Sequence, residues 1–461
     1  MESIVKSFKK FTQGYTFKVF LLFFLVLLLL IPLVMIHGLI FERSRTAVSA
    51  EATIMEAWGS ELVAAGPLIA IPGIRTETVH TRSDRGKEKV DVVNKPFTLI
   101  VTPQELAVSA DLKTEIRKRG IFSVPLFHGD LSLSGKFNPA QAISSLLSNE
   151  KVFFDQAELI IVLSSQKGIR RIDRAVWNNH SLFFQPGNRE VNIVRTINSI
   201  STKHNSSFSS NGIYAALPEF TNAESDFDIS IAIQGGRLVR FLPIGLKTRS
   251  TVSADWASPS FQGAFLPGSS TITDSGFSAV WDISYLSRDI PLFWKSEGGQ
   301  RNYSDSLFGV NFFRAIDTYS LNTRAVKYAI LFLVVPFLTL FLLEIFASKK
   351  IHPVPYLLSG IANVVFYLLL LSLSEQMPFF LAYLIAAIAV IVMLTLYSRA
   401  LLPSWNKSWY MGIVVTISYV LLYAILNAES YALLIGSIGA FTVVALVMFL
   451  TRKLNWYNFG E

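Results

Sequence analysis

The sequence predicts an α+β membrane protein with one N-terminal transmembrane helix, a large β-rich domain and a C-terminal bundle of five transmembrane helices. Long uncharged apolar runs lie near both ends of the chain, and alternating apolar residues fill much of the middle; past Tyr319 the pattern switches to continuous apolar. About 20 apolar residues in a helix can cross a hydrocarbon core of roughly 30 Å. Alternation with period two is typical of strands that bury one face.

Residues 1–18 carry four lysines against one acid, and residues 19–41 contain no acid and no strong base. We predict a cytoplasmic N-terminus followed by a transmembrane helix over 19–41. The alternative is a signal peptide cleaved after the small residues around Ala50. Because the apolar region of a signal peptide spans only about 7–15 residues, the length of this run favours an uncleaved anchor.

Residues 42–325 are predicted to form the β-rich domain, entered through a helical stalk over 42–64. Two blocks, 105–137 and 227–241, alternate apolar and polar residues, and the second contains Gly235-Gly236, which predicts a turn between two strands. These blocks predict a large, mainly antiparallel sheet structure, built as one sheet or as two packed sheets.

Three segments of this domain are predicted to be less regular. Residues 75–95 are rich in charge and are expected to form a hairpin or a mobile loop. Residues 178–211, rich in Ser and Asn, are predicted to be an internal loop region. In residues 256–267 Pro and Gly interrupt aromatics, which predicts a loop fixed by packing or, as the alternative, a rigid lip near the bilayer; core packing is the more common role of such a cluster.

Residues 326–453 are predicted to contain five transmembrane helices, followed by a cytoplasmic tail over 454–461; the five spans are 326–346, 354–373, 379–397, 410–426 and 431–450. The connections that bear basic residues alternate with connections that contain no basic residue and carry one acid each, Glu375 or Glu429. Since basic loops remain in the cytoplasm, both termini are predicted to be cytoplasmic and residues 42–325 to lie outside.

Composition excludes several classes of function. Of the chain's 41 Lys+Arg and 33 Asp+Glu, residues 41–325 hold 30 and 28, so most of the net charge of +8 flanks the membrane segments and reports topology, not nucleic-acid binding. There is no cysteine, and the six histidines lack the spacing of a metal site. No cofactor and no enzymatic activity are predicted, although a hydrolase assembled from distant residues stays a remote alternative.

Four polar residues of the membrane segments are candidates for function: Glu344, Asn363, Tyr367 and Glu375. Glu344 is expected either to snorkel or pair with a cation at the interface, or to belong to a proton or ion relay with Asn363 and Tyr367. Glu375 is expected to be solvated in a turn. Ser359, Asn363, Tyr367 and Ser374 recur near helical spacing, which predicts one side of a helix that faces protein.

Small residues in the last spans predict a compact bundle. Ala382 and Ala386, and Gly436 and Ala440, are each four residues apart, a spacing that lets helices approach closely. No span carries a sustained polar stripe, so the pattern does not indicate a pore.

Nine segments spread over nearly the whole chain form a pattern that resembles a known family: Gly66–Pro72, Arg117–Phe122, Trp256–Pro267, Gly276–Trp281, Arg324–Ile330, Ile351–Pro353, Tyr356–Leu358, Phe366–Glu375 and Ala382–Ala386. With these segments the chain resembles the CreD family of bacterial inner-membrane proteins. The family pattern has Gln where Pro355 stands and His where Gln376 stands, which weakens any role given to those two positions.

The resemblance implies a Gram-negative inner-membrane protein, a periplasmic location for residues 42–325, and an association with envelope stability under a carbon-source-responsive two-component system. It supplies no reaction, ligand or catalytic residue. Our first hypothesis is therefore a non-catalytic protein of cell-envelope integrity whose periplasmic domain binds an envelope protein or lipid partner. The alternative is a transporter or lipid-handling protein whose periplasmic domain binds an apolar ligand. The bilayer is the one partner that the sequence defines, and the oligomeric state is open.

Overall fold

A computed structural model describes residues 15–82, 88–187, 211–296, 303–312, 318–347, 351–401, 405–428 and 431–452. The chain divides into two units: a helical unit, Met1–Val48 with Ile316–Glu461, and a β unit, Ser49–Ala315. Six helices of the described residues are long and apolar enough to cross a membrane. The predicted class is confirmed: an N-terminal apolar helix, a large β-rich region, then C-terminal helices.

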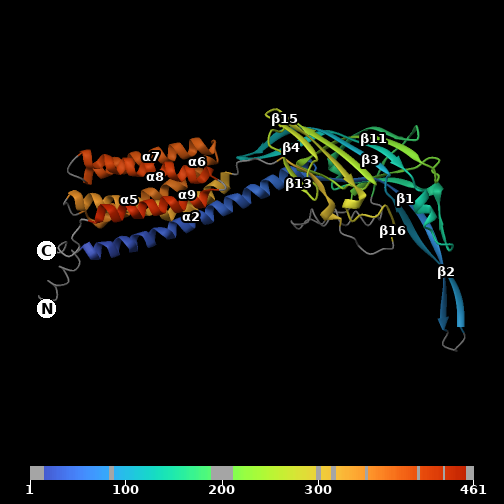
Figure 1. The fold of residues 1–461 in the computed structure, drawn as a ribbon, viewed down its shortest axis with the longest axis horizontal. Coiled ribbons are helices and arrows are strands. Elements are labelled where there is room, and N and C mark those ends of the chain that lie inside the picture. The colour runs from blue at the N-terminus through green and yellow to red at the C-terminus, as the bar shows by residue number, and fades with distance from the viewer. Residues whose placement is uncertain are drawn as a thin grey trace. The chain divides into compact units, whose positions relative to one another are not determined.

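In its described residues, the helical unit holds five helices after the β unit and the first part of a helix before it. They are α2 (Tyr15–Trp58), α5 (Thr318–Ala347), α6 (Pro353–Ser374), α7 (Phe379–Leu401), α8 (Trp405–Asn427) and α9 (Ala432–Thr451). Helices α5 to α9 run alongside one another, and the N-terminal part of α2 shares their apolar core (Figure 1). Helix α9 contributes little to this core, because few of its residues are buried.

Helix α2 continues far past the predicted span and forms the predicted stalk, but the stalk ends earlier than predicted. Gly59 adopts φ +134° and Ser60 φ 60°, and the N–H groups of both donate to the Met55 carbonyl oxygen. A left-handed residue closes a helix in this way and turns the chain into an extended path. Residues 61–64, predicted as helix, therefore begin strand β1.

The β unit contains seventeen described strands, which make one hydrogen-bonded network. The strands are β1 (Glu61–Arg82), β2 (Glu88–Val101), β3 (Glu105–Arg119), β4 (Phe122–Phe137), β5 (Glu150–Val152), β6 (Glu158–Leu163), β7 (Ile169–Trp177), β8 (His180–Ser181), β9 (Gln185–Gly187), β10 (Asn211–Ala216), β11 (Ser225–Phe241), β12 (Lys247–Ala254), β13 (Ser260–Gly263), β14 (Ser269–Thr273), β15 (Gly276–Ser284), β16 (Phe293–Lys295) and β17 (Phe308–Asn311). A short helix, α3 (Ala140–Ser144), follows β4.

Most pairings are antiparallel, as predicted, including β1 with β2, β3 with β4 and β4 with β11. Two pairings are parallel, β1 with β11 and β3 with β12, and both join strands far apart in the sequence. Alternation along β3 buries Leu106, Val108, Ala110 and Leu112 and exposes the residues between them. The buried faces share one apolar core, in which Trp177 and Trp281 are fully enclosed.

The predicted turn at Gly235-Gly236 is wrong, because β11 continues as a strand through both glycines and is only bulged at the next residue, Arg237, which has φ 29°. A Cβ on Gly235 would lie 2.5 Å from the Phe127 ring, and one on Gly236 would lie 2.5 Å from Met55. The two glycines therefore admit neighbouring side chains against a continuous strand. The same pattern of residues serves a turn or a close approach, and only the packing distinguishes them.

The other irregular segments are partly strand. Residues 75–82 of β1 and 88–95 of β2 pair as a hairpin, which projects from the rest of the β unit (Figure 1), and residues 83–87 lie outside the described residues. The loop predicted over 256–267 contains strand β13, which pairs with β17. Of the loop predicted over 178–211, the described part holds β8 and β9, and residues 188–210 lie outside the described residues.

Candidate functional site

One face of α6 carries four buried polar side chains. Ser359, Asn363, Tyr367 and Ser374 are each 6% exposed or less, so these residues share a protein-facing side as their spacing predicts. Pro353 starts the helix, and the His352 side chain caps it by accepting the Val354 N–H.

Glu344 lies at one end of this face in a buried ion pair. Its carboxylate accepts hydrogen bonds from Lys18 Nζ, at 2.5 Å to each oxygen, and from the Tyr356 hydroxyl at 2.6 Å. Lys18 Nζ also donates to the Ile351 carbonyl at 2.6 Å. The Glu344 side chain is 1% exposed, so it pairs with a cation and does not snorkel.

Asn363 lies in the middle of the face and joins three helices. Its Nδ2 donates to the Phe332 carbonyl of α5 at 2.8 Å, and its Oδ1 accepts the Tyr419 hydroxyl of α8 at 2.6 Å. The Phe332 carbonyl needs a partner because Pro336, four residues on, has no N–H to donate to it. Asn363 thus satisfies a backbone group that the proline leaves free.

Tyr367 follows one turn later and lies in an aromatic cluster. Its ring packs edge-on against Phe366, with centroids 5.0 Å apart, and Phe366 also contacts Tyr383 and Tyr419. The Tyr367 hydroxyl is buried and hydrogen-bonds to none of the described residues. Tyr383 donates to the Tyr419 carbonyl at 2.6 Å, so α7 is bonded to α8 in the same layer.

Glu375 lies at the opposite end of α6 from Tyr356 and is not solvated as predicted. Its side chain is 12% exposed, accepts the Tyr319 hydroxyl at 3.1 Å and lies 3.9 Å from Arg43 of α2. Nearby, Asn322 Nδ2 donates to Ser374 Oγ at 2.9 Å, so α5 and α6 are bonded here too. The turn is covered because the first residues of α5 and part of α2 pack beside it.

These contacts make three layers of polar cross-links between helices. In the described part of the chain, Glu344 bonds to Lys18 and Tyr356, and it does not bond to Asn363 or Tyr367. The sequence therefore suggested the relevant residues of α5 and α6 but missed their partners. Lys18 is separated from Glu344 by more than 300 positions, and no local pattern links the two.

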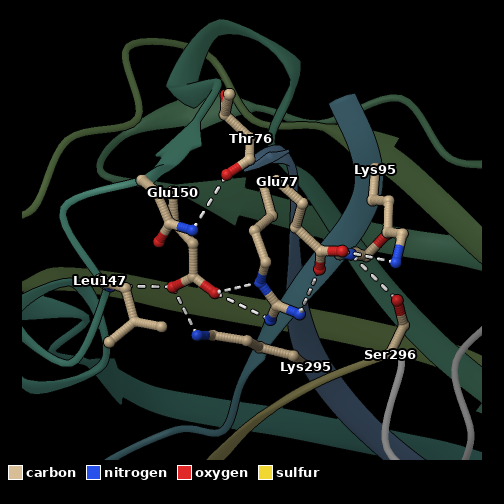
Figure 2. Close-up of polar contacts among 10 residues, drawn as sticks. Thr76, Glu77, Lys95, Leu147, Glu150, Lys295 and Ser296 are labelled. Atoms are coloured by element: carbon tan, nitrogen blue, oxygen red, sulfur yellow. Dashed lines mark hydrogen bonds and ion pairs between the residues drawn. The ribbon is translucent and has the colours of Figure 1, made fainter. Parts of the chain in front are cut away.

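The β unit contains a second buried charge cluster, which sequence reasoning missed. Glu150 is fully buried: its carboxylate accepts from Arg75 Nε at 2.9 Å and from Arg75 Nη2 at 2.8 Å, from Lys295 Nζ at 2.5 Å and from the Leu147 N–H at 2.8 Å (Figure 2). Burial by itself raises the pKa of this carboxyl. The hydrogen bonds from Lys295, Leu147 and Arg75 outweigh that effect and hold the pKa at about 2, below its ordinary 4.5.

This cluster connects β5, which holds Glu150, to β1 and β16. Arg75 of β1 is 75 positions from Glu150 in the sequence, and Lys295 of β16 is 145 positions from it. Arg75 also approaches Glu77 at 3.8 Å, and Lys95 lies 2.5 Å from the same Glu77 (Figure 2). Every carboxylate here has a cation beside it, so the cluster joins strands and leaves no free base. Among the described residues, no group of His, Asp and Glu is arranged to hold a metal ion.

A long apolar helix, a β-rich unit and five further apolar helices, of which α5 to α8 are bonded to one another through buried polar groups, define a multi-pass membrane protein. The family model described as "Inner membrane protein CreD" matches residues 14–457, so the chain belongs to the CreD family. The inner membrane protein CreD of Escherichia coli (strain K12) is 29% identical over 443 residues, which cover 95% of this chain and 93% of the relative.

Proposed function

We propose that this protein is a non-catalytic component of the bacterial inner membrane that contributes to cell-envelope integrity through its β unit. The proposal includes the predicted orientation, with both termini in the cytoplasm and residues 42–325 in the periplasm. The alternation of basic and acidic connections supports this orientation, and similarity to an inner membrane protein supports the location.

The buried contacts of Glu344 are the observation that supports an anchoring role for the helical unit over a transport role. An ionisable group that serves a transport pathway faces a partner or cavity along that pathway. Glu344 is 1% exposed, and its carboxylate is occupied by Lys18 and Tyr356. Such a pair fixes α2, the helix that leads into the β unit, to α5 and α6. The helical unit then acts as an anchor, and recognition falls to the β unit.

The β1–β2 hairpin is the surface that we propose for the envelope partner. Val90, Val92 and Val93 of β2 are 55%, 67% and 40% exposed, and between Glu77 and Phe97 no described strand pairs with the outer edge of β1 or β2, so both edges are open to further pairing there. Such a hairpin is marginally stable by itself, so a binding partner would stabilise it. A cavity of about 270 Å³ in the β unit has a mixed lining, in which three amide side chains stand beside apolar ones such as Leu246 and Phe293, so it favours neither a polar nor an apolar ligand.

Complementation of a strain that lacks this protein tests the anchor. Glu344→Gln leaves the Lys18 cation buried without its counter-charge, so we expect lower protein abundance. Adding Lys18→Gln removes the second charge and should restore both the abundance of the protein and the resistance of the cells to detergent. If the double variant is normally abundant but the cells stay sensitive to detergent, Glu344 would instead belong to a proton or ion relay.

A shortened hairpin tests the partner surface in the same strain. Residues 78–92 are replaced by two glycines, which keeps the Arg75, Glu77 and Lys95 contacts. We expect normal abundance with loss of detergent resistance. Full resistance with the shortened hairpin would contradict the proposed surface.

Reporter enzymes fused after Glu461 and near Ser207 check the orientation. A reporter that works only in the cytoplasm should be active after Glu461, and one that works only in the periplasm should be active near Ser207.

A further inference from the structure

The hairpin of β3 and β4 extends well past the strands on either side of it. Strand β12 pairs with β3 over residues 105–112, and β11 pairs with β4 over residues 126–137. Among the described residues, 113–125 pair only within the hairpin, and we call this segment the β3–β4 tip (Figure 1). Its turn is narrow, because Gly120, with φ 61°, and Ile121 alone connect the two strands.

The β3–β4 tip carries an excess of positive charge. Residues 113–125 contain four bases and one acid, and that acid, Glu115, accepts a hydrogen bond from Arg117 Nε at 2.8 Å. Lys118 and Arg119 are exposed, and neither pairs with an acid in the described part of the chain. Unpaired bases that lie close together favour an anionic partner.

Large apolar side chains lie beside these bases. Ile116 is 48% and Ile121 38% exposed, and the guanidinium of Arg117 lies 3.9 Å from the centre of the Trp58 ring. A soluble anion interacts with the bases alone. The surface of a bilayer offers phosphate groups to bases and hydrocarbon to apolar side chains, and segments that lie on it combine both kinds of residue. The composition of the β3–β4 tip therefore fits a bilayer surface better than a soluble anion.

The contacts of α2 determine which way the β3–β4 tip points within the β unit. A Cβ on Gly236 of β11 would lie 2.5 Å from Met55 of α2. One turn nearer the N-terminus of α2, Glu51 lies 4.0 Å from Arg237, the next residue of β11. Strand β4 is antiparallel to β11, and Leu126 lies opposite Gly236. The hairpin therefore continues from Leu126 to the tip in the direction in which α2 runs back toward its N-terminus.

The two chain connections to the membrane helices also leave the β unit at this place. Helix α2 enters the β unit past Glu51. At the other connection, the Phe312 N–H donates to the Arg237 carbonyl at 2.7 Å, six positions before α5 begins at Thr318. The chain thus passes to the membrane helices on the side of the β unit toward which the β3–β4 tip points.

The β3–β4 tip is long enough to reach the bilayer surface. From Leu126 to Gly120 the hairpin spans six residues, or about 20 Å at 3.3 Å per residue. From Met55 back to Phe41, the last residue of the predicted span, α2 spans fourteen residues, or about 21 Å at 1.5 Å per residue. The two lengths match, so the tip extends about as far as the helical segment that separates Met55 from the bilayer.

We propose that the β3–β4 tip binds anionic phospholipid headgroups at the surface of the bilayer that the chain spans. Lys118 and Arg119 contact the phosphate groups, and Ile116 and Ile121 enter the apolar edge of the headgroup layer. The contact gives the β unit an attachment to the membrane in addition to its two chain connections. It goes beyond the proposed function, because it involves neither the β1–β2 hairpin nor the envelope partner.

The full-length protein in nanodiscs provides the test. The chain has no cysteine, so a single introduced cysteine carries a fluorophore at one place only. Ile121→Cys labels the tip. Leu286→Cys labels a side chain that is 79% exposed, two residues past Ser284, which pairs with Lys247 opposite Glu105 at the far end of β3. The nanodiscs contain phosphatidylcholine with a spin label on its headgroup, which quenches a nearby fluorophore, and are prepared with and without phosphatidylglycerol.

We expect strong quenching of the label at position 121 when phosphatidylglycerol is present, and little quenching at position 286. An unquenched label at position 121 would overturn the proposal and leave these bases to a soluble anionic partner. Equal quenching at position 121 with and without phosphatidylglycerol would overturn the choice of anionic headgroups.

Two double variants, each carrying the label at position 121, sharpen the test. Lys118→Gln with Arg119→Gln should lower the ratio of quenched to unquenched label about thirtyfold, since each base near an anionic surface contributes about fivefold. Lys247→Gln with Arg249→Gln is the matched control: it removes the same charge from exposed side chains at the far end of β3 and should leave the quenching unchanged. Equal effects of the two double variants would also overturn the proposal. If the first variant fails to fold, the comparison of the two kinds of nanodisc decides by itself.

Discussion

The Glu150 cluster makes a quantitative prediction about the stability of the β unit. Its carboxyl has a pKa of about 2 in the folded protein and an ordinary value of 4.5. A difference of 2.5 units corresponds to about 3 kcal/mol in favour of the folded state at neutral pH. Glu150→Gln removes this contribution and leaves Arg75 and Lys295 close together without their shared anion. We expect a loss of about 3 kcal/mol, which lowers the midpoint of thermal unfolding by roughly 6–12 °C.

The pH dependence has a definite sign. Because the folded-state pKa is depressed, the stabilisation is complete above about pH 4.5 and is lost as the pH falls through about 2. The difference in midpoint between the unaltered protein and Glu150→Gln should therefore be constant from pH 7 to 5 and shrink below pH 4.5. Tryptophan fluorescence of the detergent-solubilised full-length protein measures it, since Trp294 is adjacent to Lys295 in the chain.

Glu224→Gln is the matched control, because Glu224 pairs with Lys136 at 3.0 Å but is 49% exposed. An exposed pair contributes little, so its midpoint should hardly change. The reasoning is refuted if Glu150→Gln is as mild as this control, or if its effect is the same at pH 7 and pH 3.

Two further predictions concern the helical unit, each read as the unfolding midpoint in detergent. A Cβ on Gly360 would lie 2.2 Å from Leu29 and 2.7 Å from the Phe337 ring, so Gly360→Ala should lower the free energy of unfolding by about 1–3 kcal/mol. The control is Gly38→Ala, which should be neutral or stabilising because no atom lies within 4 Å of that Cβ. Equal effects of the two substitutions would mean that α2, α5 and α6 do not meet at Gly360. Asn363→Ala deprives the Phe332 carbonyl and the Tyr419 hydroxyl of partners, at about 1–3 kcal/mol for each buried group. Adding Pro336→Ala supplies an N–H to that carbonyl and should recover roughly half of the loss; no recovery would contradict the role given to the proline.

The fold class and the membrane helices follow from local properties of the sequence. A helix that crosses a bilayer must satisfy its own backbone and present apolar side chains over about 20 residues, so each span leaves a continuous record. Strands with one buried face leave a record of period two, as Leu106 to Leu112 of β3 show. The shared face of α6 was predictable for the same reason, since helical spacing determines which side chains point together.

Contacts between residues that are far apart in the sequence leave no local pattern that could predict them. Gly235-Gly236 reads as a turn because glycine favours turns, but Phe127 and Met55 occupy the space beside those residues. Glu375 reads as a solvated turn residue, but Tyr319 and Arg43 cover it. In both cases the deciding side chain belongs to an element far away in the chain, so no window of sequence around the residue contains it.

By itself, then, the sequence determined the class of protein, the number of long apolar helices, the alternating faces of the strands and the family resemblance, because each depends on side chains close together in the chain. The tertiary structure alone decided which cation meets Glu344, which carbonyl Asn363 satisfies, which strands Glu150 joins and which way the β3–β4 tip points within the β unit. These depend on distances between elements that chain order does not specify, and burial makes each unpaired charge or unfilled space costly enough to require its partner.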